Sequence, residues 1–143
     1  MTFHIRDGLK RSDGTPITCA DFEYALKREV DPFTPGKQYT GIVYDVKGAK
    51  ELDDYANATD PDKLDKAKVD ELYQNYGVKC LDESNLEVTF NNALGFWQYI
   101  ASTWVTFPTD KRAVDADPDT WWTKPEGHVG NGPFVMSERA GRA

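Results

Sequence analysis

A strand, a turn and a capped helix follow one another within residues 2–30. Residues 2–6 alternate between polar and apolar side chains, which predicts a half-buried strand. The dipeptide Asp13-Gly14 is typical of a turn. Thr18 and Asp21 then have the spacing of a short-armed capping box, which predicts that a helix begins there. A strand followed so closely by a helix indicates a core that is built from both strands and helices.

The following elements are also marked by local signals. Asp31-Pro32 ends the first helix, because the residue before a proline avoids helical backbone. Residues 33–44 predict an ordered loop that runs into a helix over residues 47–58. Asp60-Pro61 begins another helix, which Gly77 ends. The apolar face of the first helix consists of Phe22, Ala25, Leu26 and Val30.

The second half of the chain predicts a hairpin and several short elements. The hairpin covers residues 78–90, with its loop at residues 82–85. Residues 95–103 predict a short aromatic-rich helix, residues 118–123 a brief one, and Phe134–Met136 a last strand. The fold class is therefore α+β, with a small, mainly antiparallel sheet and flanking helices.

The bulk properties suit a single compact domain. A chain of 143 residues can bury a core, and its 13% of aromatic residues is too high for a disordered tail. The net charge of −7 argues against a nucleic-acid surface, which requires clustered lysine and arginine. The apolar runs are all shorter than the roughly 18 residues of a membrane span.

The two cysteines, Cys19 and Cys80, lie far apart in the sequence. Their spacing matches neither a metal-ligand pattern nor a disulfide framework. A single bridge would require their Cα atoms to lie within about 7 Å of each other, which a sequence does not show. We therefore expect two small, buried, free thiols.

No group of residues has the pattern of a catalytic or metal site. His4 and His128 have no partner at ligand spacing, so we expect them to be ordinary solvated or hydrogen-bonded histidines. The carboxylates of Asp53-Asp54, and of Asp115 with Asp117, lie in polar sequence, and we expect them to be surface charges. The sequence therefore predicts no enzyme, no metal and no cofactor.

Aromatic residues offer the remaining candidates for a binding site. Most of those in the second half are expected to be core residues, although they could line a ligand cleft. They are Trp97, Tyr99, Trp104, Phe107, Trp121 and Trp122. Tyr39 and Tyr44 differ, because they lie in or beside a loop that contains glycine and proline, where binding residues concentrate.

Four segments in order resemble the landmarks of one protein family. They are Phe3–Pro32, Val46–Glu51, Gly77–Phe90 and His128–Met136. In the family the first runs F-x-L-R, W-S-D-G-T-P and T-A-x-D-F, and the last runs I-V-G-N-G-P-F. The chain thus resembles the extracytoplasmic solute-binding proteins of peptide/nickel ABC importers, known as family 5.

The resemblance implies a larger protein whose two lobes close on a ligand. Residues 1–143 would be a single domain, the accessory subdomain of the first lobe of a periplasmic-binding-protein-like fold. The whole protein would capture peptides, nickel complexes or oligosaccharides outside the cytoplasmic membrane and deliver them to an ABC permease. Its signal sequence would lie upstream, and its partners would be the solute, the rest of the binding protein and the permease. An autonomous small enzyme and a standalone interaction domain are the alternatives.

The resemblance also implies a ligand-contacting tyrosine in the loop after the first helix. Tyr39 lies nearest to that position, and Gln38 and Tyr44 are the alternatives. Two departures from the family pattern stand out. Arg11 replaces the usual tryptophan, and residues 52–76 are longer than in compact relatives, which predicts a surface insertion.

Overall fold

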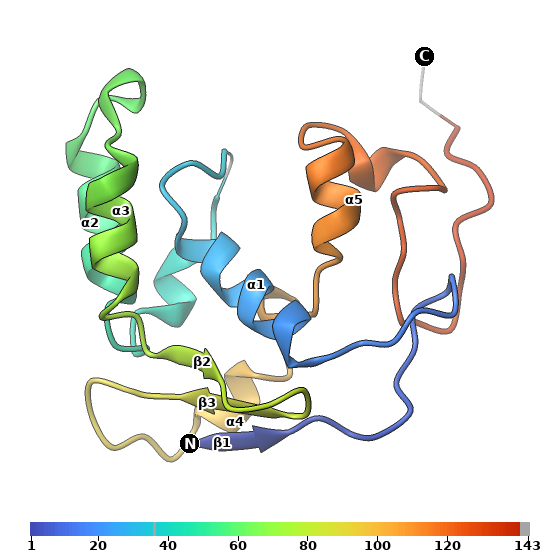
Figure 1. Cartoon of the computed structure of the whole chain (residues 1–143), viewed down its shortest axis with the longest axis horizontal. Coiled ribbons are helices and arrows are strands. Elements are labelled where there is room, and N and C mark those ends of the chain that lie inside the picture. The colour runs from blue at the N-terminus through green and yellow to red at the C-terminus, as the bar shows by residue number, and fades with distance from the viewer. Residues whose placement is uncertain (36, 141–143) are drawn as a thin grey trace.

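A three-stranded antiparallel sheet forms the base of the molecule as drawn in Figure 1, and most of the helices lie above it. The computed structural model describes residues 1–35 and 37–140. The strands are β1 (Thr2–His4), β2 (Val78–Cys80) and β3 (Asn85–Val88), in the order β1-β3-β2. Leu86 of β3 lies opposite both Phe3 and Cys80. The predicted first strand, the hairpin and the fold class are confirmed.

Five α-helices and four 3₁₀ turns are present in the described part of the chain. The helices are α1 (Cys19–Val30), α2 (Ala49–Ala58), α3 (Lys66–Tyr73), α4 (Trp97–Ile100) and α5 (Lys111–Ala116). The 3₁₀ turns are η1 (Thr40–Val43), η2 (Pro61–Lys63), η3 (Trp104–Thr106) and η4 (Trp121–Thr123). Across residues 1–35 and 37–140, no helix has the length and apolar character of a membrane span.

Helix α1 lies across the sheet and is the centre of the packing (Figure 1). It begins as predicted, because the backbone N–H of Thr18 donates to the carboxylate of Asp21 at 2.8 Å. Leu26 and Val30 on its inner face are buried. The hydroxyl of Tyr76 donates to the carbonyl oxygen of Leu26 at 2.9 Å, which joins the end of the α3 segment to α1.

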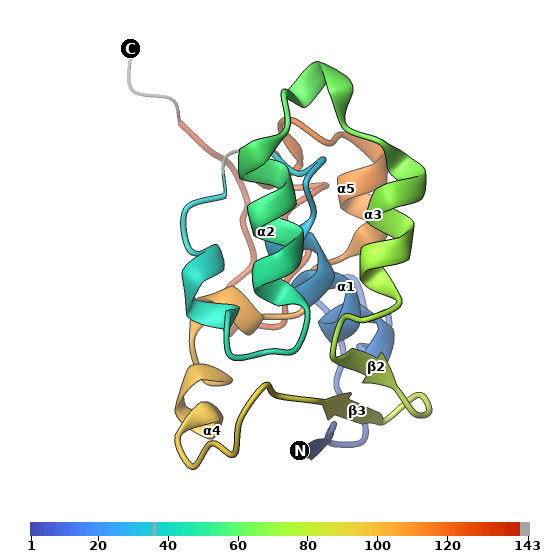
Figure 2. The ribbon, with the colours of Figure 1, turned by 90° about the vertical axis from the view of Figure 1, so that its left-hand side faces the viewer.

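Residues 52–76 form most of a helical hairpin, α2 and α3, which stands at the left-hand end of the molecule in Figure 1 and faces the viewer in Figure 2. Leu52 and Val69 anchor its inner side in the core. The single helix expected from Asp60-Pro61 onward is divided, because the side chain of Asp65 caps a new helix by accepting from the N–H of Ala67 at 2.8 Å. That these residues are an insertion relative to compact relatives stays a prediction.

Cys19 and Cys80 form a disulfide, so the expectation of two free thiols is wrong. Cys19 is the first residue of α1, and Cys80 is the last residue of β2. The packing of α1 against β2 brings their Cα atoms to 5.8 Å, within the range that a bridge requires. This approach depends on tertiary packing, which the spacing of cysteines in a sequence does not report.

Arg11, at the position where the family resemblance implies tryptophan, forms buried ion pairs. Its side chain is 7% exposed, and its guanidinium pairs with Asp21 and lies 3.8 Å from Asp110. Arg112 donates to the same Asp110 carboxylate at 2.6 Å and to Asp13 at 3.1 Å. These contacts hold together the turn after β1, the start of α1 and the start of α5.

The strand expected at Phe134–Met136 is absent, and the prediction is wrong. The segment is irregular, and Phe134 and Val135 are exposed. A strand requires a neighbour to satisfy its backbone N–H and C=O groups. Within the part of the chain that the structure describes, no other strand pairs with this segment.

Candidate ligand-binding site

The loop between α1 and α2 carries the three candidate ligand residues. The loop starts with a turn in which the Asp31 carboxylate accepts from the N–H of Phe33 at 2.9 Å. Thr40, at the start of η1, is buried and donates its hydroxyl hydrogen to the carbonyl oxygen of Glu29 at 3.1 Å. Val43 enters the core three residues later. The loop is therefore attached to α1 at both ends of its exposed part.

Tyr39 lies on the outside of this loop, against Trp104 of η3. The two ring centroids are 5.6 Å apart, and the ring planes meet at 86°. Tyr39 is 48% exposed and Trp104 is 61% exposed. Edge-to-face contact is a preferred geometry of aromatic pairs, so the two rings hold each other in place while their outer surfaces face solvent.

Gln38 is exposed beside Tyr39 and lines a small polar pocket of about 200 Å³. Lys37 lines the same pocket, and its Nζ is buried with no hydrogen-bond partner among the residues that the structure describes. Burial lowers the pKa of Lys37 and raises the pKa of Glu29 on the adjacent wall. The pocket therefore places polar groups next to the exposed aromatic pair.

Tyr44 makes its side-chain contact with α2. Its hydroxyl donates to the carboxylate of Asp53, which also accepts from the side-chain amide of Asn57 at 2.9 Å. The hydrogen bond to Asp53 raises the pKa of Tyr44 to about 12. The structure thus groups Gln38 with Tyr39 and gives Tyr44 an internal contact, and a role for Tyr44 in ligand binding stays a prediction.

Asp53 is only 8% exposed, so the expectation that it is a surface charge is wrong. Helix α2 turns this residue toward η1, where the hydroxyl and amide donors of Tyr44 and Asn57 satisfy the carboxylate. Its neighbour Asp54 is exposed and pairs with Lys50 at 2.5 Å, as expected for a surface charge.

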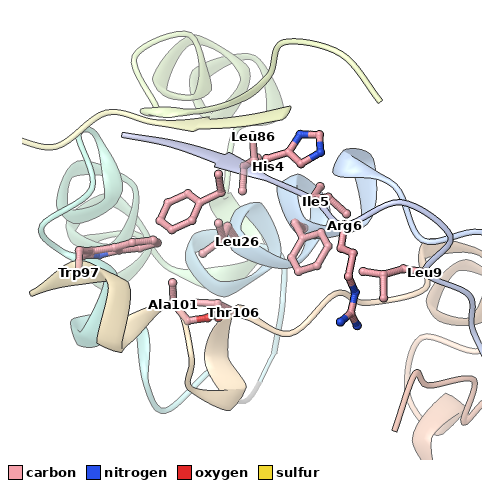
Figure 3. Close-up of a pocket in the computed structure, with 11 residues that line it drawn as sticks. His4, Ile5, Arg6, Leu9, Leu26, Leu86, Trp97, Ala101 and Thr106 are labelled. Carbon is pink, nitrogen blue, oxygen red and sulfur yellow. Dashed lines mark hydrogen bonds between the residues drawn. The ribbon is translucent and has the colours of Figure 1, made fainter. Parts of the chain in front are cut away.

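An apolar pocket of about 260 Å³ lies between β1, α1, α4 and η3 (Figure 3). Trp97 closes one end, Leu26 lies at the centre, and Arg6 and Leu9 lie at the other end (Figure 3). Its lining consists of Phe3, His4, Ile5, Arg6, Leu9, Phe22, Leu26, Leu86, Trp97, Ala101 and Thr106. Such a lining suits apolar groups and contains no paired acid and base.

The histidines lie apart from any arrangement for catalysis. His4 is exposed, and its Nδ1 lies 3.1 Å from Oδ1 of Asn85. His128 is also exposed. No group of three or more histidine, cysteine or acidic side chains in the described ranges could hold a metal ion.

The expectation that most of the later aromatic residues are core residues is wrong. Trp97 is in the core, with 1% of its surface exposed and its ring 5.0 Å from that of Phe90. The exposed residues are Tyr99, Trp104, Phe107 and Trp122. They lie in short helices, turns and loops, where the spacing of residues does not identify a buried face.

Comparison with known proteins identifies the family. Residues 1–142 match the family described as bacterial extracellular solute-binding proteins, family 5 Middle. The chain belongs to this family. Membership agrees with the resemblance carried by the four landmark segments, and a family of solute-binding proteins gives no support to the alternative of an autonomous enzyme.

Similar proteins within family 5 are named for peptide binding. The chain is 32% identical over 140 residues to the periplasmic murein peptide-binding protein MppA of Escherichia coli, covering 96% of this chain and 23% of MppA. It is 31% identical over 136 residues to the oligopeptide-binding protein OppA of Bacillus subtilis, covering 95% of this chain and 22% of OppA. The structure of Burkholderia pseudomallei OppA superimposes with a TM-score of 0.77 at 29% identity, covering 97% of this chain and 24% of that one. The chain therefore spans about a quarter of the length of these relatives.

Proposed function

We propose that this chain is part of the substrate-binding component of an ABC importer. The component captures peptides outside the cytoplasmic membrane and delivers them to the permease. The observation that carries the proposal is the match to family 5 over residues 1–142, together with relatives named for peptide binding. The mechanism is reversible capture by closure of two lobes around the solute, and no covalent bond is made or broken.

Within this chain, Gln38 and Tyr39 contact the solute. Both are exposed, and the loop that carries them is anchored by the buried Thr40. An amide and a phenol next to each other can bond to peptide groups and cover apolar surface. Tyr44 supports the loop through its hydrogen bond to Asp53. Most of the contacts to the solute come from the rest of the longer protein.

The disulfide supports an extracytoplasmic location. Disulfides form and persist in oxidising compartments and are rare in the cytosol. Cys19 and Cys80 form a disulfide in this chain, which favours an oxidising compartment. A secretory signal sequence upstream of this segment would direct the protein there, and reading the coding sequence upstream of this segment tests for it.

A titration of the full-length polypeptide that carries this segment tests the function. Peptides of two to five residues, a nickel chelate and a maltooligosaccharide are each titrated calorimetrically. We expect binding of peptides with a Kd on the order of 1 μM or tighter, and no heat with the other two. Binding of the chelate or the sugar in place of peptides would overturn the proposal.

A matched pair of variants tests the role of the loop. Tyr39→Ala removes the proposed contact, and Phe33→Ala removes another exposed ring of the same loop. We expect Tyr39→Ala to weaken peptide binding about tenfold and Phe33→Ala to leave it within about twofold. Equal effects of the two variants would argue against a specific role for Tyr39.

A further inference from the structure

We propose that Trp104, together with Tyr39, forms a subsite for an aromatic side chain of the bound peptide. The inference deepens the proposed function and rests on it, because it assumes that the longer protein binds peptides. It adds Trp104 as a residue that determines which side chain is preferred. The sequence patterns favour the core for Trp104, with a ligand cleft as the alternative.

The exposure of Trp104 is the first observation. Trp104 is 61% exposed, whereas Trp97, seven positions earlier, is 1% exposed. Tyr99 and Phe107, on either side of Trp104 in the sequence, are exposed as well. Exposed aromatic residues mark surfaces that bind a ligand or pack against another part of a protein, since exposing their rings to water is unfavourable.

The geometry of the two rings indicates the shape of the occupant. Tyr39 directly precedes η1, and Trp104 is the first residue of η3. The two turns lie next to each other in Figure 2, η1 in teal and η3 in gold. The two ring planes meet at 86°, so the rings form a corner with two perpendicular walls. A third aromatic ring can stack on one wall and present its edge to the other, and both contacts are favourable. A sugar ring is suited to a flat platform rather than to a corner.

Both walls of the corner are held by hydrogen bonds and buried neighbours. The hydroxyl of Thr106 donates to the carbonyl oxygen of Ala101 at 2.9 Å, and Val105, next to Trp104, is buried. Thr40, next to Tyr39, is buried and bonded to the carbonyl of Glu29. A preformed corner loses little conformational entropy when a ligand enters.

The polar groups of the corner belong to exposed side chains. They are the hydroxyl of Tyr39, the indole N–H of Trp104 and the amide of Gln38. They can meet the polar edge of a tyrosine or tryptophan side chain, or the backbone beside it. The chemistry therefore favours peptides with an aromatic side chain over peptides with aliphatic or charged ones.

The experiment uses the full-length binding protein and a set of alanine pentapeptides in which one tyrosine is moved through each position. For at least one position, we expect the tyrosine peptide to bind about five- to tenfold tighter than the all-alanine peptide. Trp104→Ala should reduce this ratio to nearly one. Trp122→Ala removes another exposed tryptophan and should leave the ratio unchanged.

The outcomes separate the two proposals. If the wild-type protein binds no peptide, the proposed function fails. If it binds peptides but the ratio is unchanged by Trp104→Ala, only the subsite fails. If Trp104→Ala does not fold, Tyr39→Ala removes the other wall of the corner and must reduce the same ratio. An unchanged ratio in that variant overturns the subsite equally.

Discussion

Cys19 and Cys80 are joined by a disulfide that ties the first residue of α1 to the last residue of β2. The bridge closes a long loop, which restricts the unfolded chain more than it changes the folded one. We expect the double variant Cys19→Ala, Cys80→Ala to lose about 3 kcal/mol of unfolding free energy, measured by urea denaturation. Reduction of the wild type with dithiothreitol should give a similar loss. An unchanged midpoint of urea denaturation in both experiments would contradict the prediction that the disulfide stabilises the fold.

Asp110 is expected to contribute stability that depends on pH. The hydrogen bond from Arg112 holds the pKa of Asp110 below the ordinary aspartate value of 3.8 in the folded state. The ionised form is thus favoured by folding, and its contribution is complete above about pH 4 and is lost as the pH falls through the lowered pKa. We expect Asp110→Asn to cost about 2 kcal/mol at pH 7, because Arg11 stays buried without this partner.

The control for this experiment is Asp115→Asn. Asp115 pairs with Lys111 on the surface, and both side chains are exposed. Exposed pairs of this kind contribute about 0.5 kcal/mol or less. For the test variant itself, the difference in unfolding free energy between wild type and Asp110→Asn should shrink on acidification from pH 5 toward pH 2. A difference that grows over that range would refute the account of this carboxylate.

The phenol of Tyr44 is expected to ionise at a higher pH than an ordinary tyrosine. Its pKa is raised from 10.0 to about 12 by the hydrogen bond to Asp53, so the neutral phenol stabilises the folded state. The contribution is complete below pH 10 and is lost as the pH rises toward 12. We expect Tyr44→Phe to cost about 1 kcal/mol at pH 7 and to remove one late-ionising phenol from the ultraviolet titration.

Substitution of Trp97 and of Trp104 should change the stability of the fold by different amounts. Trp97→Ala should cost about 3–5 kcal/mol, because its ring packs on Phe3 and Phe90 inside the core. Trp104→Ala should cost less than about 1 kcal/mol, since its ring is largely exposed. Chemical denaturation of both variants measures the two losses, and comparable losses would mean that Trp104 has a structural role.

The local elements of the fold could be predicted, because their signals lie in adjacent residues. The capping pair Thr18 and Asp21 marked the start of α1, and the alternation around Leu86 marked the hairpin. Helix α5 was missed, although Asp110 is a suitable cap and its carboxylate accepts from the N–H of Arg112 at 3.0 Å. Lys111 to Ala116 carry only one buried apolar residue, so the helical period is weak.

The contacts between distant segments could not be predicted. The Cys19–Cys80 bridge depends on how α1 packs against β2, and the burial of Asp53 depends on the approach of Tyr44. The same is true of the candidate site. The loop composition pointed to Tyr39, but the position of Trp104 beside it is a product of tertiary structure. Spacing alone had favoured the core for Trp104.

The central claim is that this chain supplies one wall of a peptide site and that the rest of the protein completes the site. Calorimetric titration of one peptide into the full-length polypeptide and into the 143-residue chain tests it most directly. We predict a Kd on the order of 1 μM or tighter for the full-length polypeptide and binding at least about 100-fold weaker for the isolated chain. Equal affinity of the two, or no peptide binding by the full-length polypeptide, would contradict the claim.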